Sequence, residues 1–308
     1  MIDLWIWLKP RGLDAVLGMV IPPKAKQYIK FVEDSVQKRV ELEEETQKQG
    51  SAKLDGRKDI FHYILAAKDP ETGGLALSRE DLVGEANILV VAGSDTTPVV
   101  LAGFFFYMTR NSRILAKLTS EIRSTFKSVD EISWSKKLSS FQYLRACIDE
   151  TLRLCPTSPS DLDREVISDM EIDGCFVRTG THVGCSPWTV SRNEDSYPDA
   201  NVFRPERFIF DEQAGVTTED VARAQDSHFP FSLGPFNCVG KNLAMLELTV
   251  TIARTLYRMD VRALPGDTLS EGAPELGWGR RHRNLFQYKD AFVAIRNGPI
   301  VQFRKRQN

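Results

Sequence analysis

Apolar residues recur at helical spacing through most of the chain and predict a mainly helical protein. The spacing predicts helices over residues 24–49, 59–68, 78–110, 112–127, 141–154 and 243–257. Short runs rich in β-branched and aromatic residues, separated by glycines, predict hairpin strands over 165–191 and over 260–308. We therefore expect a mainly α fold with small β-sheets, of the α+β class, forming a single domain over residues 1–308.

The beginning of the chain differs in pattern from the rest. Residues 1–21 are apolar and aromatic and end at Pro22-Pro23, and residues 50–56 have the composition of a linker. The first residues lack the basic start and the cleavage site of a signal peptide. No run reaches the ~18–20 apolar residues of a membrane span, so we expect no transmembrane anchor in this chain.

The helix predicted over 78–110 contains polar residues where its pattern predicts burial. Its centre, 86–106, is mostly apolar and should cross the protein core. Within it lie Gly93, Asp95, Thr96, Thr97 and Pro98. Such a break in an otherwise consistent pattern is typical of a functional site. The alternative is a kinked, buried helix whose threonine hydroxyls bond their own backbone carbonyls.

A second unusual stretch, residues 229–257, joins a Gly/Pro loop to an apolar helix. The loop has the spacing F-x-x-G-x-x-x-C-x-G, with Phe231, Gly234, Cys238 and Gly240 at the named positions. The free N–H groups and the dipole of the following helix favour an anion at Cys238. Because a thiolate is the form of cysteine that binds a metal, Cys238 is a candidate ligand. The alternative is a small buried cysteine.

A third pattern places charges on the helix over 141–154. Glu150 and Arg153 are three residues apart and share one face of that helix, as many surface pairs do. The run Phe203-Arg-Pro-Glu-Arg207-Phe208 follows later in the chain.

Bulk composition excludes several classes of function. Among 308 residues, 42% are hydrophobic and 27% are charged, which is ordinary for a soluble globular protein. A net charge of −2 gives no general reason to expect nucleic-acid binding. The five cysteines are odd in number and lack C-x-x-C spacing, which argues against a disulfide framework or a zinc cluster and favours a reducing compartment.

Together the three patterns resemble those of the cytochrome P-450 family of haem-thiolate monooxygenases. All of the chain resembles the C-terminal part of a member, most closely in the style of fungal microsomal enzymes of secondary metabolism. The resemblance implies that Cys238 is the axial ligand of the iron in haem b, with Phe231 and Gly240 framing it. It also implies that Gly93 leaves room for dioxygen, and that Asp95 and Thr96 pass protons to it.

The resemblance assigns further residues and shows departures. Glu150, Arg153 and Arg207 would form a charge network that supports the haem pocket. Arg164 would reach a haem propionate, although Asp163 replaces the proline that usually precedes it. Phe236 replaces an Arg or His that normally pairs a propionate, and Pro98 adds a kink after Thr96. The portion of the family that precedes the first helices is not matched, so we expect an N-terminally truncated domain.

Three functions are compatible with these residues. The first is a monooxygenase that oxidises an apolar small molecule, such as a terpenoid, polyketide or alkaloid, with electrons from an NADPH-dependent reductase. Lys241 is a candidate contact for that reductase, or simply a solvated lysine, and relatives imply the endoplasmic reticulum surface. The second is a haem-thiolate isomerase or dehydratase, which the pair Asp95 and Thr96 disfavours. The third is an inactive truncated remnant without stable haem.

Overall fold

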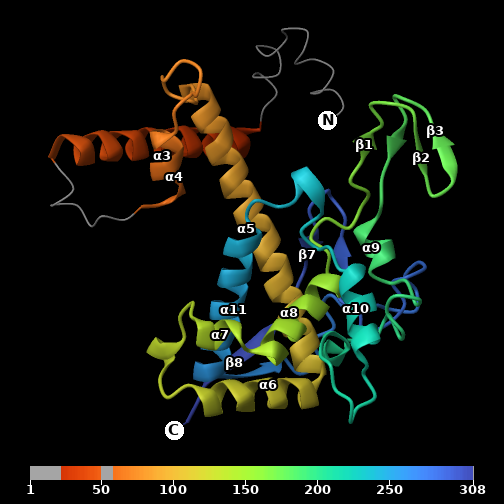
Figure 1. Ribbon diagram of the computed structural model, residues 1–308. Helices are drawn as coiled ribbons and strands as arrows, with labels where there is room; N and C mark the ends of the chain where they lie inside the picture. Colours follow the sequence, from red (N-terminus) through yellow and green to blue (C-terminus); the bar gives the residue numbers. More distant parts are fainter. Residues whose placement is uncertain (1–21, 50–57, 308) are drawn as a thin grey trace. The chain divides into compact units, whose positions relative to one another are not determined.

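The computed structural model describes residues 22–49 and 58–307 (Figure 1). The interpretations of residues 1–21 and of the linker 50–56 lie outside these ranges. The chain divides into two compact units after Ala92, within a helix that continues through the boundary. The expectation of one domain stays a prediction, and each unit is described by itself.

The first unit is a small helical cluster. It contains α3 (Pro23–Gln49), α4 (Ile60–Ala66) and the beginning of α5 (Arg79–Arg110). Val32 and Val36 of α3 pack with Leu82 and Ala86 of α5 in a buried cluster. Each pair is four residues apart, so each lies on one face of its helix. The predicted helices over 24–49 and 59–68 are therefore confirmed.

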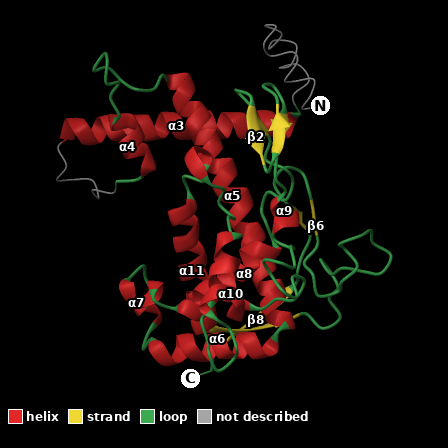
Figure 2. Cartoon of the chain, turned by 45° about the vertical axis from the view of Figure 1, so that its right-hand side comes forward, coloured by secondary structure: helices red, strands yellow, loops and turns green. Residues whose placement is uncertain are grey.

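The second unit packs its longer helices around one hydrophobic core. These helices are α6 (Ser112–Thr125), α8 (Gln142–Leu154), α11 (Lys241–Arg258) and the rest of α5. Figure 2 shows them together, with the loops and most of the short strands of this unit beside them. Shorter helices connect them: α7 (Lys136–Ser139), α9 (Pro187–Val190), α10 (Thr218–Asp226), η2 (Val129–Glu131), η3 (Pro205–Phe208) and η4 (Gly234–Phe236).

The described strands form antiparallel pairs. These are β1 (Arg164–Glu165) with β4 (His182–Val183), β2 (Met170–Ile172) with β3 (Cys175–Val177), β5 (Met259–Ala263) with β8 (Val301–Lys305), and β6 (Tyr288–Lys289) with β7 (Ile295–Arg296). In the longest pair, Met259 lies opposite Lys305 and Ala263 opposite Val301. The α+β class with small sheets is confirmed, including the strands of the terminal region.

One predicted strand is wrong. Residues 188–191 were expected to extend a hairpin, but Trp188 lies in helix α9. Ser186 caps this helix by accepting a hydrogen bond from the backbone N–H of Thr189, and Pro187 occupies its first turn. The local cap and proline therefore outweigh the strand preference of the aromatic and β-branched residues that follow.

The expectation that α5 is buried along its whole centre is also wrong. From Val99 onward the helix enters the core, where Tyr107 stacks on Phe203 and Phe106 contacts Phe286. Residues 87–95 are largely exposed, and Ile88 has 60% of its surface accessible. The side chains that cover α5 in the second unit all meet its C-terminal half, which explains the difference.

Length and composition make α5 resemble a membrane helix. Among the described residues it is the one helix that is long and apolar enough to cross a bilayer, which corrects the expectation that no segment reaches that length. The core helix of a soluble protein passes the same test. The packing of residues 99–108 in the hydrophobic core identifies this half of α5 as a core helix.

Candidate functional site

The loop that precedes α11 holds Cys238 in a defined backbone conformation. The backbone N–H of Cys238 donates a hydrogen bond to the carbonyl oxygen of Phe231 over 2.8 Å. Gly234 begins η4 with a φ of 71°, a left-handed conformation that glycine adopts without steric cost. Phe231 packs against the core of the second unit and anchors the loop.

The sulfur of Cys238 lies at the N-terminal end of α11. Gly240 is the residue before the first turn of this helix, and its carbonyl accepts the N–H of Ala244 over 2.8 Å. The first N–H groups of a helix have no partner within the helix and favour a nearby anion. A Cβ on Gly240 would lie 3.7 Å from Sγ, an ordinary van der Waals contact, so Gly240 lies directly beside the sulfur.

Large apolar side chains are exposed in the segment that carries Cys238. Val239 has 95% of its surface accessible and Phe236 has 74%, and Leu233 and Leu243 are also exposed. A cysteine before a helix N-terminus, flanked in the sequence by exposed apolar residues, fits a haem, whose porphyrin is planar and largely apolar.

Arg164 lies beside the same loop. Its guanidinium carbon is 5.3 Å from the centre of the Phe236 ring, a cation–π distance. One nitrogen of the group, Nη1, also donates to the carbonyl of Asp163 over 2.9 Å. The structure thus places Arg164, the predicted propionate-binding residue, next to Phe236. By the family resemblance, Phe236 stands where an Arg or His is expected.

The polar residues of α5 are accessible. Gly93 and Asp95 are exposed, Thr96 is partly exposed, and α5 continues without a break through Pro98. Beyond the chain neighbours of Gly93 and the nearby backbone of its own helix, no described atom lies within 4 Å of the position that a Cβ on Gly93 would take, so the helix surface is open there. The roles of these residues in oxygen chemistry stay predictions.

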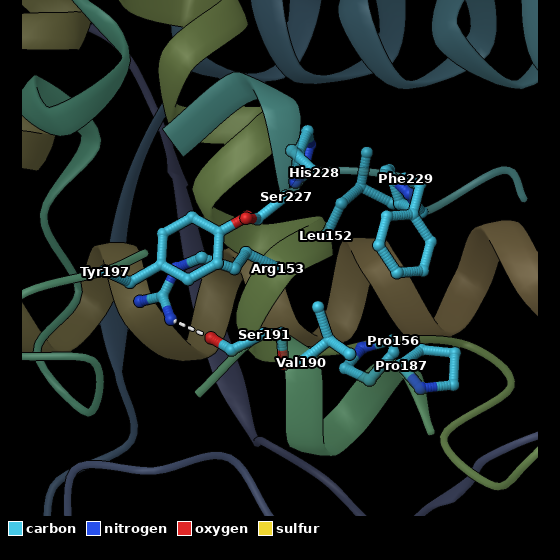
Figure 3. A pocket seen from close by; sticks show the side chains of 11 residues that line it. Leu152, Arg153, Pro156, Pro187, Val190, Ser191, Tyr197, Ser227, His228 and Phe229 are labelled. Carbon is cyan, nitrogen blue, oxygen red and sulfur yellow. Dashed lines mark hydrogen bonds between the residues drawn. The ribbon is translucent and has the colours of Figure 1, made fainter. Parts of the chain in front are cut away.

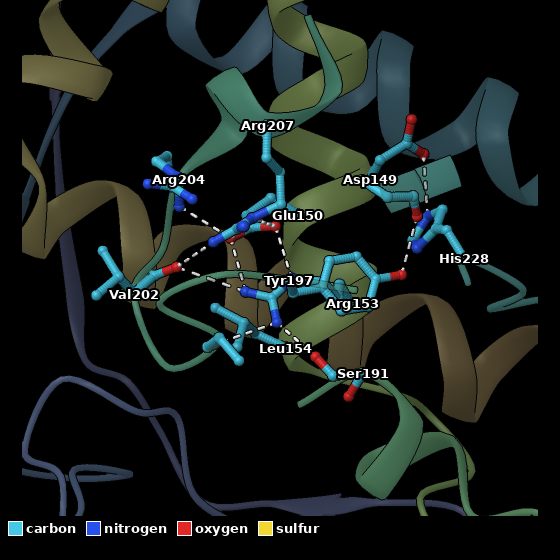
Figure 4. Close-up of polar contacts among 12 residues, drawn as sticks. Asp149, Glu150, Arg153, Leu154, Ser191, Tyr197, Val202, Arg204, Arg207 and His228 are labelled. Atoms are coloured by element: carbon cyan, nitrogen blue, oxygen red, sulfur yellow. Dashed lines mark hydrogen bonds and ion pairs between the residues drawn. The ribbon is translucent and has the colours of Figure 1, made fainter. Parts of the chain in front are cut away.

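The predicted charge network is present and buried. Arg153 donates from Nε and Nη2 to the two carboxylate oxygens of Glu150, each over 2.8 Å (Figure 4). Arg207 donates to the same carboxylate over 3.2 Å. All three side chains are buried. Glu150, Arg153 and Arg207 therefore meet as expected, and the weaker reading of the first pair as a surface pair is wrong. The role of this network in supporting a haem pocket stays a prediction.

Electrostatics within the network keep the two arginines charged. Burial alone would lower the pKa of the Arg153 guanidinium, but the charge and hydrogen bonds of Glu150 outweigh it and hold that pKa above its ordinary value. Burial lowers the pKa of Arg207 below its ordinary value. Both remain cations at neutral pH because the ordinary value for arginine is so high.

The network also fastens several loops to α8. Arg153 donates to the carbonyls of Ser191 and Ala200, and Arg207 donates to that of Pro198 over 3.1 Å. The backbone N–H of Arg204 returns a bond to Glu150 over 2.8 Å. The segment between α9 and η3 is thereby held against the helix.

Tyr197 is a member of this cluster that the sequence did not reveal. Its ring centre lies 4.9 Å from the guanidinium carbon of Arg153, and its hydroxyl donates to the carbonyl of Ala224 over 3.0 Å. It lies in a loop whose composition only indicates turns, so no periodic pattern could identify it. A cavity of about 20 Å³, room for about one water, lies between this cluster and residues 227–230 (Figure 3).

Comparison with known sequences identifies the relatives of the chain. The family model "Cytochrome P450" matches residues 14–278. Cytochrome P450 monooxygenase fscF of Fusarium equiseti is 35% identical over 91% of this chain and 52% of its own length. AKT7 of Alternaria alternata, also named a cytochrome P450 monooxygenase, is 37% identical over 81% of this chain and 48% of its own.

Two further comparisons bear on length and on fold. Cytochrome P450 monooxygenase lcsN of Purpureocillium lilacinum is 33% identical, and the match covers 97% of this chain and 84% of the relative. The crystal structure of a cytochrome P450, CYP102L1, superposes with a TM-score of 0.68 at 20% identity, covering 90% of this chain and 56% of that one. The chain thus spans about half the length of several relatives that it matches.

Proposed function

The chain belongs to the cytochrome P450 family, and from that premise we propose that it is the haem-binding part of a monooxygenase that oxidises an apolar small molecule. The observation that carries the proposal is the exposed Cys238 on its hydrogen-bonded loop before α11. Fungal relatives named as monooxygenases support the reaction class.

The described residues fit a haem, most simply haem b. Cys238 would ligate the iron, Phe231 and Gly240 would frame the sulfur, and Arg164 would face a propionate. Thiolate-ligated haem supplies oxygen activation, because the sulfur donates electron density that favours cleavage of the O–O bond. The N-terminal end of α11 favours the anionic sulfur that this ligation requires.

Other residues of the chain would support the reaction without binding the iron. The network of Glu150, Arg153 and Arg207 holds the loops around α8 in place. The exposed surface at Gly93 leaves space for a small molecule on α5. Asp95 would hold a proton beside that space, and Thr96 would pass it on, a pairing that favours an oxygenase over an isomerase or dehydratase.

The substrate and the electron donor follow from the family rather than from a described contact. A fungal secondary metabolite of the terpenoid, polyketide or alkaloid classes fits the exposed apolar residues that flank Cys238 in the sequence. An NADPH-dependent reductase at the endoplasmic reticulum surface would supply electrons. Lys241, the first residue of α11, lies close enough to the loop to contact such a partner.

The proposal is tested by the absorption spectrum of the reduced, carbon monoxide-treated chain after reconstitution with haem. We expect the strongly red-shifted Soret band of a thiolate ligand, and we expect Cys238→Ser to lose it. Cys185→Ser is the matched control, because Cys185 is also an exposed cysteine of the second unit. Absence of the band in the parent chain would exclude haem-thiolate function and favour an inactive remnant, whereas a band that survives Cys238→Ser would exclude Cys238 as the ligand.

A further inference from the structure

His228 immediately precedes the loop that carries Cys238, and its side chain is enclosed. The side chain is 12% exposed, and its ring lies 5.0 Å from that of Phe208. Among the described residues, no group lies within hydrogen-bonding distance of Nε2, although this atom is buried. A buried polar atom without a partner is costly and calls for an explanation.

The carboxylate of Asp149 on α8 forms an ion-pair contact with His228. Its Oδ1 lies 3.7 Å from His228 Nε2, and the Asp149 side chain is 13% exposed (Figure 4). This distance is too long for a direct hydrogen bond but short enough for an ion pair when the imidazole is protonated. Asp149 directly precedes Glu150, the centre of the buried network.

Other charged and titratable residues near this pair include Arg145, Arg153 and Tyr197. Arg145 of α8 donates from Nε to both oxygens of Asp149, over 3.0 and 2.8 Å, and is itself largely exposed. Arg153 and Tyr197 line the small cavity that His228 also lines (Figure 3). Asp149 is thus the anion that faces His228, and Arg145 keeps that carboxylate oriented.

The position of His228 is linked to that of the sulfur through the backbone. Its N–H donates to the carbonyl of Gln225 over 3.0 Å, which joins it to the end of α10. Two further bonds follow: Ser232 donates to Phe229 over 2.9 Å and Cys238 to Phe231 over 2.8 Å. A displacement at His228 would therefore reach the backbone that sets the direction of Cys238.

We propose that His228 is a positioning residue that fastens the cysteine loop to α8 through Asp149. This contact would keep Cys238 in a fixed position relative to the Glu150 network. The importance of this contact for the thiolate rests on the proposed function, but its effect on the loop does not require haem.

The first test measures hydrogen–deuterium exchange of residues 229–240 in the haem-free chain. Asp149→Asn and His228→Gln should each speed exchange in this segment about five-fold, which corresponds to ~1 kcal/mol for one ion pair. The double variant should be no faster than the faster single variant, because both changes remove one contact. Exchange in α6 should stay the same in all variants.

A matched control is available in the first unit. His62 Nδ1 lies 2.9 Å from Glu43 Oε1, another partly buried histidine–carboxylate pair. His62→Gln should leave exchange in residues 229–240 unchanged. Unchanged exchange in the two test variants, or additive effects in the double variant, would overturn the proposal.

The second test uses the haem-reconstituted chain. The thiolate fraction of its carbon monoxide complex should be lower in Asp149→Asn and in His228→Gln than in the parent. The same fraction should be unchanged in His62→Gln. If no haem binds but the exchange result holds, the proposed function fails and the positioning role stands.

Discussion

At the scale of single residues, the proposed haem edge would carry one cation. The family resemblance implies an Arg or His at position 236, where this chain has Phe236, and the structure places the Phe236 ring 5.3 Å from the guanidinium carbon of Arg164. The aromatic face attracts the cation by its quadrupole but cannot itself neutralise a carboxylate. Arg164 would therefore be the one cation of this pair that could face a propionate.

Phe236→Arg should tighten haem binding about five-fold, because a second guanidinium gains a charge-assisted bond to a propionate. The haem-free variant should be no more stable than the parent, since Arg164 would then face a like charge. Titration of haem absorbance and thermal unfolding measure the two quantities. Phe210→Arg, at another exposed phenylalanine, is the control, and equal affinities of parent and Phe236→Arg would contradict the assignment.

At the scale of elements, α8 organises the second unit. One face presents Glu150 and Arg153 to the loop between α9 and η3, and another face packs into the core. Its C-terminal end meets α5 so closely that a Cβ on Gly103 would overlap the sulfur of Cys155. The helix and its charged pair were predictable from local spacing, whereas the carbonyls that Arg153 binds come from residues 38 to 49 positions later.

Arg153→Ala should destabilise the second unit by about 3–5 kcal/mol, because it leaves the Glu150 carboxylate buried with only part of its charge compensated. Haem loading should be lost with it. Arg223→Ala removes an exposed arginine from another pair three residues apart, with Asp220, and should cost at most about 1 kcal/mol. Urea unfolding compares the two variants, and equal costs would show that burial does not matter here.

At the scale of the whole molecule, the core of the second unit contains ionisable groups held in their neutral form. Burial raises the pKa of the Cys155 thiol to about 12 and that of Tyr197 to about 12. Burial also raises the pKa of Cys147 well above its ordinary range. These groups keep their protons in the folded state at a pH where the unfolded chain releases them.

Stability should therefore fall as pH rises above about 9, the ordinary thiol value, since the folded state then binds more protons than the unfolded one. Each buried thiol contributes a slope of at most about 1.4 kcal/mol per pH unit. The Cys155→Ala variant should be less stable than the parent at neutral pH. Its free energy of unfolding should nevertheless fall less steeply with pH in the range below the ionisation of the tyrosines. Cys175→Ala, at an exposed thiol, should keep the parent's slope when unfolding is followed by urea titration.

The sequence by itself determined the features that depend on neighbouring residues. Helical spacing predicted α3, α5, α6, α8 and α11, and the loop spacing identified Cys238 before a helix, because periodicity and capping act within a few turns. It failed where a local cap converted residues 188–190 to helix and where packing covered only half of α5.

Only the tertiary structure decided which distant residues meet. It placed Arg164 on Phe236, Tyr197 against Arg153 and His228 opposite Asp149. Such contacts depend on how loops close between elements and on which backbone carbonyls they present, and neither is encoded in the spacing of any one segment. The position of Cys238 before a helix could therefore be predicted from local sequence. The contacts of its loop with other segments depend on packing between residues far apart in the chain.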